Sequence, residues 1–286
     1  MDDIKAKKKF GQNFLKDQSI INQIIEAMPH TNHLIAEIGP GLGDLTHHLV
    51  KIRSVTAFEV DTDLCKHLNQ EFRQELEDKH FTLHCGDVLE RWGQDKKDAT
   101  ASLVEENYDL VANLPYYIAT KIILQALEDP KCKNMLVMVQ KEVADKFSAD
   151  VGEKVFSGLA VLTQTVGKAR TVVNVPPAAF NPPPKIDSAV VLIEKNGNLP
   201  IEGFSNFLKI AFAQPRKTLA KNLSSHIDKE LISEALTSLN MSATIRPHET
   251  STQLYHKLYS QLKGTFDGSK QQRKQSKRTK QSGSKR

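Results

Sequence analysis

The sequence is poor in the features that mark secreted and membrane proteins. Its three cysteines, Cys65, Cys85 and Cys132, are odd in number and widely spaced, which fits neither a disulfide framework nor a zinc site. No apolar run approaches the roughly 20 residues that a membrane-spanning helix needs, and residues 1–5 do not lead into the apolar core of a signal peptide. We therefore expect reduced, buried thiols, no bound metal, no membrane contact and a cytoplasmic location.

Acidic residues are missing from the C-terminus. From Lys270 to Arg286 there are eight basic residues and no acidic one, whereas the net charge of the whole chain is +5. Five minus those eight leaves −3 on the rest, so the basic character is concentrated at this end. We predict that residues 265–286 form a disordered tail, which either binds polyanions or keeps the protein in solution.

A second basic cluster opens the chain. Four of residues 5–9 are lysines, and the sequence FGQNFL follows at residues 10–15. Lysines next to aromatic rings suit contact with nucleic acid, because the cations meet phosphates and the rings pack on bases. The alternative is an ordered lid with Phe10 and Phe14 in the core, and the pattern leaves both interpretations open.

A glycine-rich turn at residues 37–43, EIGPGLG, organises the rest of the chain. It lies between an apolar run typical of a buried strand, residues 33–36, and a segment with helical spacing of apolar residues, 44–50. Glycines there allow unusual backbone dihedrals and the close approach of a ligand. The free N–H groups of the following helix favour an acidic or polar group on that ligand.

Polar residues recur at the ends of the next predicted strands. Glu59 ends a strand about 20 residues after the turn, the spacing at which a carboxylate holds ribose hydroxyls in nucleotide-binding folds. Asp87 and Asn113 follow the third and fourth strands. Strands alternating with helices predict an α/β fold with a doubly wound, mostly parallel sheet, whose ligands bind at the carboxyl ends of the strands. Gly39 lies at the corresponding end of the first strand.

The pattern changes near residue 198, after which only helices are predicted. We expect an α/β domain over residues 1–198, a small all-helical domain over 199–264, and the basic tail over 265–286. The helical part contains a basic helix start with Arg216 and Lys217, which suits either an RNA contact or an ordinary solvated face.

The sequence Asn113-Leu114-Pro115-Tyr116 is the most specific motif of the chain, and it resembles the N-P-P-Y/F-like motif of enzymes that methylate the exocyclic amine of a base. The lone pair of an exocyclic base amine is delocalised into the ring, so the amine is a poor nucleophile. The side-chain oxygen of Asn113 and the carbonyl of Leu114 can accept its hydrogens and direct the lone pair at a methyl donor. Pro115 fixes the backbone, and Tyr116 offers a face for an extruded base, worth roughly 1–3 kcal/mol per stack. The alternative is a plain strand-end turn.

A proline-rich loop over residues 175–188 is stiff, because each proline fixes its own φ and restricts its predecessor. It presents one aromatic residue, Phe180. The loop suits either a wall that holds a base or a structural crossover between two strands.

Seven motifs occur in one order: FGQNFL at 10–15, EIGPGLG at 37–43, EVD at 59–61, GD at 86–87, NLPY at 113–116, QKEV at 140–143 and FNPPPKIDS at 180–188. Together they resemble the rRNA adenine N6,N6-dimethyltransferases, in particular the bacterial small-subunit (16S) type, from about Lys8 to Leu262. The resemblance implies a Rossmann-like, class I methyltransferase fold. It also implies a monomer that uses S-adenosylmethionine to dimethylate two adjacent adenines in the 3′-terminal hairpin loop of 16S rRNA within the pre-30S subunit.

The resemblance also implies roles for individual residues. Contacts to S-adenosylmethionine fall on Asn13, Leu15, Gly39, Glu59, Asp87 and Asn113. The catalytic set is Asn113, Leu114, Pro115, Tyr116 and Phe180, with the rings of Tyr116 and Phe180 expected to sandwich the target base. Arg216 and Lys217 match the part that grips rRNA. Two alternatives stay open: a 23S rRNA adenine methyltransferase of the resistance type, and a non-catalytic RNA-binding factor on the same fold.

Overall fold

The computed structural model describes residues 6–7, 10–93, 102–198 and 200–265. The chain divides into two compact units: Met1–Ser148 with Val166–Leu199, and Ala149–Thr165 with Pro200–Arg286. The second unit therefore includes residues 149–165, which lie within the range that the sequence assigned to the first domain. The basic tail, most of the N-terminal lysines and residues 94–101 lie outside the described residues.

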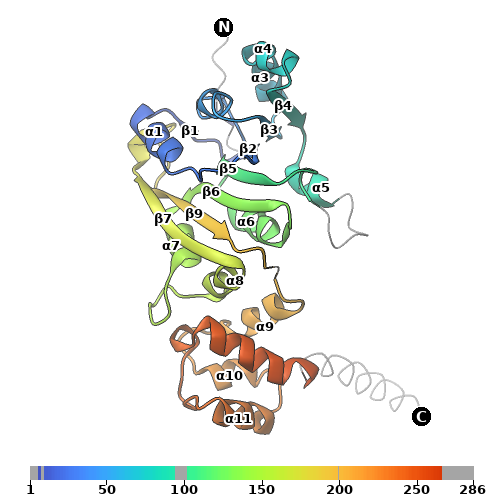
Figure 1. Ribbon diagram of the computed structural model, residues 1–286. Helices are drawn as coiled ribbons and strands as arrows, with labels where there is room; N and C mark the ends of the chain where they lie inside the picture. The colour runs from blue at the N-terminus through green and yellow to red at the C-terminus, as the bar shows by residue number, and fades with distance from the viewer. Residues whose placement is uncertain (1–5, 8–9, 94–101, 199, 266–286) are drawn as a thin grey trace, which may run out of the picture. The chain divides into compact units, whose positions relative to one another are not determined.

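A seven-stranded sheet forms the centre of the first unit, with strand order β4-β3-β2-β5-β6-β9-β7 (Figure 1). In this order the first five strands, β4, β3, β2, β5 and β6, are parallel to one another, whereas β9 is antiparallel to both β6 and β7. This confirms the predicted mostly parallel, doubly wound sheet. The bounds are β2 (Leu34–Ile38), β3 (Val55–Glu59), β4 (Phe81–Cys85), β5 (Tyr108–Asn113), β6 (Cys132–Gln140), β7 (Gly167–Val175) and β9 (Ser188–Lys195).

Two helices of this unit, α1 and α3, begin at an aspartate that caps them. The side chain of Asp17 accepts backbone N–H bonds at the start of α1, and that of Asp61 does so at the start of α3. Apolar faces of these helices then join alternate residues of the sheet, such as Val55 and Val111, in one buried core. The helices are α1 (Gln18–Glu26), α2 (Thr46–Leu49), α3 (Thr62–Glu71), α4 (Arg73–Glu77), α5 (Val88–Gly93), α6 (Ala119–Glu128) and α7 (Lys141–Ser148).

The strand order places a topological switch between β2 and β5. The chain goes from β2 outward through β3 to β4, and then returns to β5 on the other side of β2. Open parallel sheets bind ligands in the crevice outside the carboxyl ends of the strands at such a point. Gly39 directly follows β2, and Asn113 is the last residue of β5.

A short two-stranded sheet connects two distant segments of the first unit. β1 (Phe14–Leu15) pairs antiparallel with β8 (Phe180–Asn181), and the N–H of Lys16 donates to the carbonyl of Ala179 at 2.8 Å. The proline-rich loop is therefore a crossover between β7 and β9 that also anchors the N-terminal segment.

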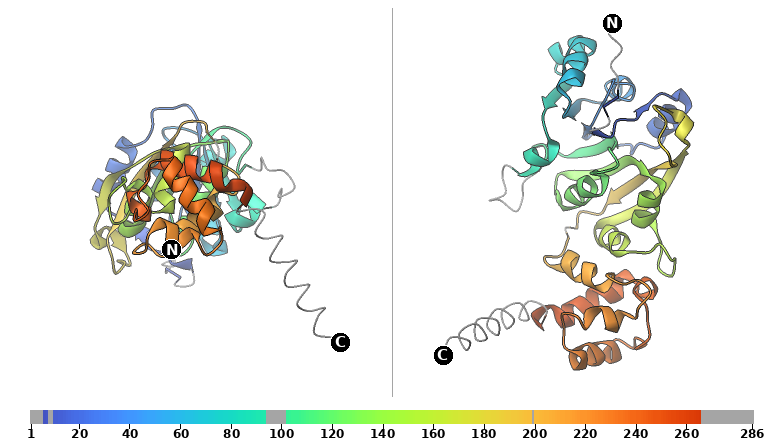
Figure 2. Two further views of the ribbon diagram at one scale, coloured as in Figure 1. Left: turned by 90° about the horizontal axis from the view of Figure 1, so that it is seen from below. Right: turned by 180° about the vertical axis from the view of Figure 1, so that it is seen from behind.

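The second unit is helical, as predicted for the C-terminal region. It holds most of α8 (Gly158–Val166) together with α9 (Phe204–Ala211), α10 (Leu219–Leu223), α11 (Lys229–Ser238) and a helix over residues 252–265. Its core is aromatic: the ring of Tyr259 lies 5.3 Å from the rings of both Phe204 and Phe207. Figure 2 shows the last helix, in red, alongside the orange helices α9–α11.

The expectation of three reduced, buried thiols is wrong for two of them. Cys65 and Cys85 form a disulfide with a Cα–Cα distance of 6.2 Å, and Cys85 is exposed. The physical reason is the packing of helix α3 over strand β4, which brings together two cysteines that are 20 residues apart in the sequence. Cys132 is free and buried, as expected. Among the described helices, none is long and apolar enough to cross a membrane.

Candidate active site

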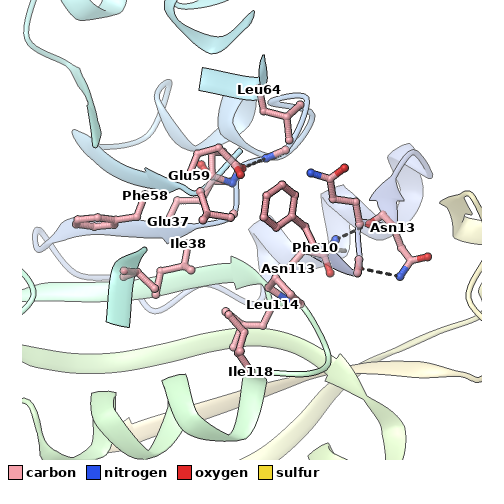
Figure 3. Close-up of a pocket in the computed structure, with 18 of the residues that line it drawn as sticks. Phe10, Asn13, Glu37, Ile38, Phe58, Glu59, Leu64, Asn113, Leu114 and Ile118 are labelled. Carbon is pink, nitrogen blue, oxygen red and sulfur yellow. Dashed lines mark hydrogen bonds between the residues drawn. The ribbon is translucent and has the colours of Figure 1, made fainter. Parts of the chain in front are cut away.

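One pocket lies at the carboxyl ends of the parallel strands, and the N-terminal segment 10–15 forms one side of it. Its walls come from the turns after β2, β3, β4 and β5. In Figure 3 the ring of Phe10 reaches between Glu59 and Asn113. The lining includes nine of the predicted site residues: Asn13, Leu15, Gly39, Glu59, Asp87, Asn113, Leu114, Pro115 and Tyr116.

The glycines after β2 are required by their conformation. Gly39, Gly41 and Gly43 have φ values of 69°, 63° and 90°, in the left-handed region that side chains avoid. A Cβ on Gly41 would lie 3.1 Å from the ring of Phe14, and one on Gly43 would lie 2.7 Å from that of Phe72. The turn thus lets the N-terminal segment and the helix behind it approach closely.

Glu59 is a buried carboxylate that points into the pocket. Its side chain is 4% exposed, and its two oxygens accept the backbone N–H groups of Gly41 at 3.3 Å and of Asp61 at 2.9 Å. Burial raises the pKa of Glu59, while these backbone hydrogen bonds oppose that rise. Each carboxylate oxygen can accept two hydrogen bonds, so Glu59 retains acceptor capacity for ligand hydroxyls.

Glu37 is a second buried acid beside the first. It is 2% exposed, and the hydroxyl of Thr46 donates to it at 2.7 Å. Burial raises the pKa of Glu37 to about 8, and the charge of Glu59 adds to the rise. Glu37 is therefore mostly neutral at pH 7, which keeps two negative charges from facing each other beneath the glycine turn.

Asp87 lies at the rim of the pocket and is exposed. Its Oδ1 accepts the N–H of Leu89 at 2.8 Å and so helps to start α5. Val88 and Leu89, which directly follow Asp87, also line the pocket, as does Phe58. These residues combine an acceptor with apolar walls, a combination that suits a flat heterocycle carrying an amino group.

Asn113 joins the strand end to the N-terminal segment. Its Nδ2 donates to the backbone carbonyl of Asn13 at 3.0 Å. Because the partner is a carbonyl oxygen, the atom that faces it must be the amide nitrogen. The side-chain oxygen of Asn113 is the acceptor that remains for a ligand amine.

The three residues after Asn113 are held firmly. The N–H of Leu114 donates to the carbonyl of Met138 at 3.1 Å, and the carbonyl of Pro115 accepts the N–H of Ile118 at 3.1 Å. The hydroxyl of Tyr116 shares a 2.7 Å hydrogen bond with Ser188. This bond ties the aromatic ring to the end of the proline-rich loop.

The structure does not bring Phe180 to this pocket. The side chain is 4% exposed and belongs to the same core cluster as Leu15 and Val173. Its backbone pairs with Leu15 in the short sheet β1–β8. This packing matches the structural-crossover interpretation of the loop, with the phenylalanine as part of the core.

Three further residues of the pocket were not among the site residues predicted from the sequence. Gln12 lines the pocket and contacts Asp61, and Tyr117, which directly follows the NLPY motif, is 62% exposed at the rim. The Tyr117 ring lies 3.5 Å from the position of a Cβ on Gly11, so it packs on the N-terminal segment. The aromatic residue next to the motif was the available signal for Tyr117. Glu37 looked like part of the turn, and its burial has no signature in the sequence.

Within the described residues, no group of three or more His, Cys, Asp or Glu side chains is placed to hold a metal ion. The pocket instead offers what S-adenosylmethionine requires: a buried acceptor for ribose hydroxyls, apolar walls for adenine and an open glycine turn. Fold and site together define a class I methyltransferase that uses S-adenosylmethionine.

The comparisons with known proteins narrow this class. The family model "Ribosomal RNA adenine dimethylase" matches residues 3–263. The chain belongs to this family and is an S-adenosylmethionine-dependent rRNA adenine dimethyltransferase.

Related proteins match nearly the whole chain. The protein named "Ribosomal RNA small subunit methyltransferase A" of Sulfurimonas denitrificans is 58% identical, with 95% of this chain and 98% of the relative covered. The protein of the same name from Aliarcobacter butzleri is 47% identical over 92% and 98%.

Two solved structures share the fold. A dimethyladenosine transferase from Plasmodium falciparum has a TM-score of 0.70 at 24% identity, covering 88% of this chain and 98% of the other. The 23S rRNA methyltransferase ErmE has a TM-score of 0.66 at 24% identity, covering 88% and 100%.

Proposed function

We propose that this enzyme dimethylates N6 of two adjacent adenines in the 3′-terminal hairpin loop of 16S rRNA, within the pre-30S subunit. The observation that carries the proposal is the 58% identical relative, which is named for the small ribosomal subunit and is covered over 98% of its length. We further propose that the enzyme works as a monomer in the cytoplasm, where small subunits are assembled.

The cofactor is proposed to lie along the strand ends. Glu59 accepts the ribose hydroxyls, Asp87 accepts the adenine amine, and Gly39 leaves room for the rest of the molecule. Asn13 and Leu15 cover it from the N-terminal segment. The geometry of the pocket supports this placement because all five residues line it, and Glu59 is the most buried acceptor among them.

The target adenine is proposed to enter beside Asn113. The side-chain oxygen of Asn113 and the carbonyl of Leu114 accept the two hydrogens of the amine, which turns its lone pair toward the methyl group. S-adenosylmethionine supplies an activated methyl on a sulfonium leaving group. The protein therefore contributes alignment rather than a strong base. Tyr116 supplies a stacking face, and its hydroxyl is fixed by Ser188. The base must leave its stack to reach this site.

The alternative is an enzyme that methylates 23S rRNA: ErmE shares the fold at 24% identity, and that likeness concerns the fold alone. A 16S-directed and a 23S-directed enzyme differ in their RNA substrate and not in the reaction that they catalyse. We therefore expect the choice of ribosomal subunit to separate them.

The test is transfer of labelled methyl groups to ribosomal subunits that lack the modification, with small and large subunits in parallel. We expect label in small-subunit RNA, recovered as dimethyladenine. Label only in large-subunit RNA would support the 23S alternative. A protein that binds S-adenosylmethionine and labels neither subunit would be a binding factor on a methyltransferase fold.

A further inference from the structure

A buried carboxylate next to the pocket holds the N-terminal segment in place. Asp61 is 1% exposed and lies two residues after Glu59. Its Oδ1 accepts the Lys7 ammonium group at 2.6 Å, and its Oδ2 accepts the side-chain amide of Gln12 at 3.0 Å. Lys7 and Gln12 are also linked directly, because the backbone N–H of Lys7 donates to Gln12 Oε1 at 2.6 Å. One acid thus binds two points of the segment that covers the pocket.

The same acid is coupled to the ribose side of the site. The backbone N–H of Asp61 donates to Glu59 Oε1 at 2.9 Å, and Asp61 Oδ1 also accepts the N–H of Asp63 at the start of α3. Asp61 therefore holds the Glu59 carboxylate through its backbone and the N-terminal segment through its side chain. A shift of the N-terminal segment would therefore also move Glu59, the carboxylate that is proposed to bind the ribose.

The ion pair to Lys7 is not an ordinary surface contact. Removing the charge of Lys7 leaves the Asp61 carboxylate, whose side chain is 2% exposed, buried without an opposite charge, which is costly, whereas exposed pairs contribute little. The hydrogen bonds from Lys7 and Gln12 lower the pKa of Asp61 although burial opposes the change, so the acid stays charged at neutral pH. The ion pair between Lys16, which directly follows the segment, and Asp44 serves as a comparison: its distance is 2.7 Å, and both side chains are substantially exposed.

We propose that Asp61 is a positioning residue: through Lys7 and Gln12 it clamps the N-terminal segment, residues 10–15, over the cofactor and slows release of the cofactor. This inference rests on the proposed placement of the cofactor. It also assigns Lys7 a role that the basic pattern did not indicate, because its ammonium group serves two protein carboxylates, Asp61 and Asp63, rather than RNA phosphate.

The test compares five variants of the full-length enzyme: Asp61→Asn, Lys7→Met, the double variant that combines these two changes, Lys16→Met and Glu59→Gln. Asparagine remains a good helix cap, so Asp61→Asn removes the charge and preserves the start of α3. Calorimetry gives the Kd for S-adenosylmethionine, steady-state kinetics separate KM from kcat, and hydrogen exchange reports the protection of residues 10–15 in the bound state.

We expect Asp61→Asn and Lys7→Met each to weaken cofactor binding about tenfold, to raise KM for S-adenosylmethionine more than they change kcat, and to speed exchange in residues 10–15. The double variant should be no weaker than Asp61→Asn alone, because both changes remove one clamp. Lys16→Met, a matched change directly after the segment, should alter Kd less than threefold.

Two results would overturn the clamp, and they are distinguishable. If Glu59→Gln weakens binding while Asp61→Asn and Lys7→Met do not, the cofactor lies where proposed and the clamp is absent. If Glu59→Gln also leaves Kd unchanged, the placement of the cofactor fails and the clamp fails with it. Because Lys7 is partly exposed, we expect Lys7→Met to fold. This variant therefore tests the clamp even if Asp61→Asn does not fold.

Discussion

The side-chain amide of Asn113 donates to the backbone carbonyl of Asn13, which lies 100 residues earlier in the chain, at 3.0 Å. This bond orients the Asn113 side chain, because the nitrogen is committed to the carbonyl and the oxygen faces the other way. It also closes the N-terminal segment against the strand end that is proposed to hold the target amine. The proposed cofactor contact at Asn13 and the proposed amine contact at Asn113 are therefore mechanically connected.

Asn113→Ala should remove most turnover, by roughly a hundredfold or more, as expected when a group that stabilises or aligns the transition state is lost. Cofactor affinity should fall much less, because Glu59 and Asp87 remain. Single-turnover methyl transfer at saturating S-adenosylmethionine measures the first effect, and calorimetry measures the second.

The matched control is Asn22→Ala on the exposed side of α1, where Asn22 contacts only Gln18 among the described hydrogen bonds. Rates for Asn113→Ala equal to those of this control would contradict the role of Asn113 in positioning the amine.

Tyr116 and Phe180 should behave differently although both were expected to stack on the base. Tyr116 lines the pocket, whereas Phe180 is buried in the core. We expect Tyr116→Ala to raise KM for RNA and to lower kcat, and Tyr116→Phe to restore most of both by keeping the ring. Phe180→Leu should cost roughly 1–3 kcal/mol of stability, because it removes three buried carbons from the core, with little effect on kcat.

Thermal unfolding and steady-state kinetics on the same preparations separate these effects. A large loss of kcat in Phe180→Leu, at unchanged stability, would mean that the ring leaves the core to meet the base.

Much of this site could be predicted because parallel strands bring their carboxyl ends together. Gly39, Glu59 and Asn113 each follow an apolar run, so their proximity needed only the strand alternation and the rule for such sheets. What could not be predicted depends on contacts between segments far apart in the sequence. Neither the pairing of Leu15 with Phe180 nor the bond from Lys7 to Asp61 has a local signature.

The disulfide illustrates the same limit. Cys65 and Cys85 gave no spacing signal, because they meet only through the geometry of α3 above β4. The burial of Glu37 is likewise a property of the packed turn, whereas the sequence shows only an acid before a glycine.

The basic tail should add affinity for RNA without adding chemistry. Residues 265–286 carry the eight basic residues noted above and one acid, Asp267, and each phosphate contact adds to the salt dependence of binding. Deleting 265–286 should lower RNA affinity and flatten its dependence on salt, with the rate on saturating RNA unchanged. Binding measured between about 50 and 200 mM salt tests this. Equal slopes for both proteins would mean that the tail touches no phosphate.

Glu37 should make the stability of the enzyme depend on pH. Its pKa is about 8 in the folded protein and 4.5 as an ordinary glutamate, so the folded state retains a proton that the unfolded state has lost. Stability from this group is complete below about pH 4.5 and is lost as pH rises through about 8. Glu37→Gln keeps a neutral group and should escape this loss. The free energy of unfolding of Glu37→Gln relative to wild type should therefore increase from pH 5 to pH 8, by an amount on the order of a few kcal/mol.

Urea unfolding of both proteins at pH 5 and pH 8, without cofactor, measures this difference. Glu26→Gln on the exposed side of α1 serves as the surface control. A gap between Glu37→Gln and wild type that stays constant over this range would mean that Glu37 is charged in the folded protein. The glycine turn would then lie above two negative charges, and Thr46, whose hydroxyl bonds to Glu37, would become the residue to test next.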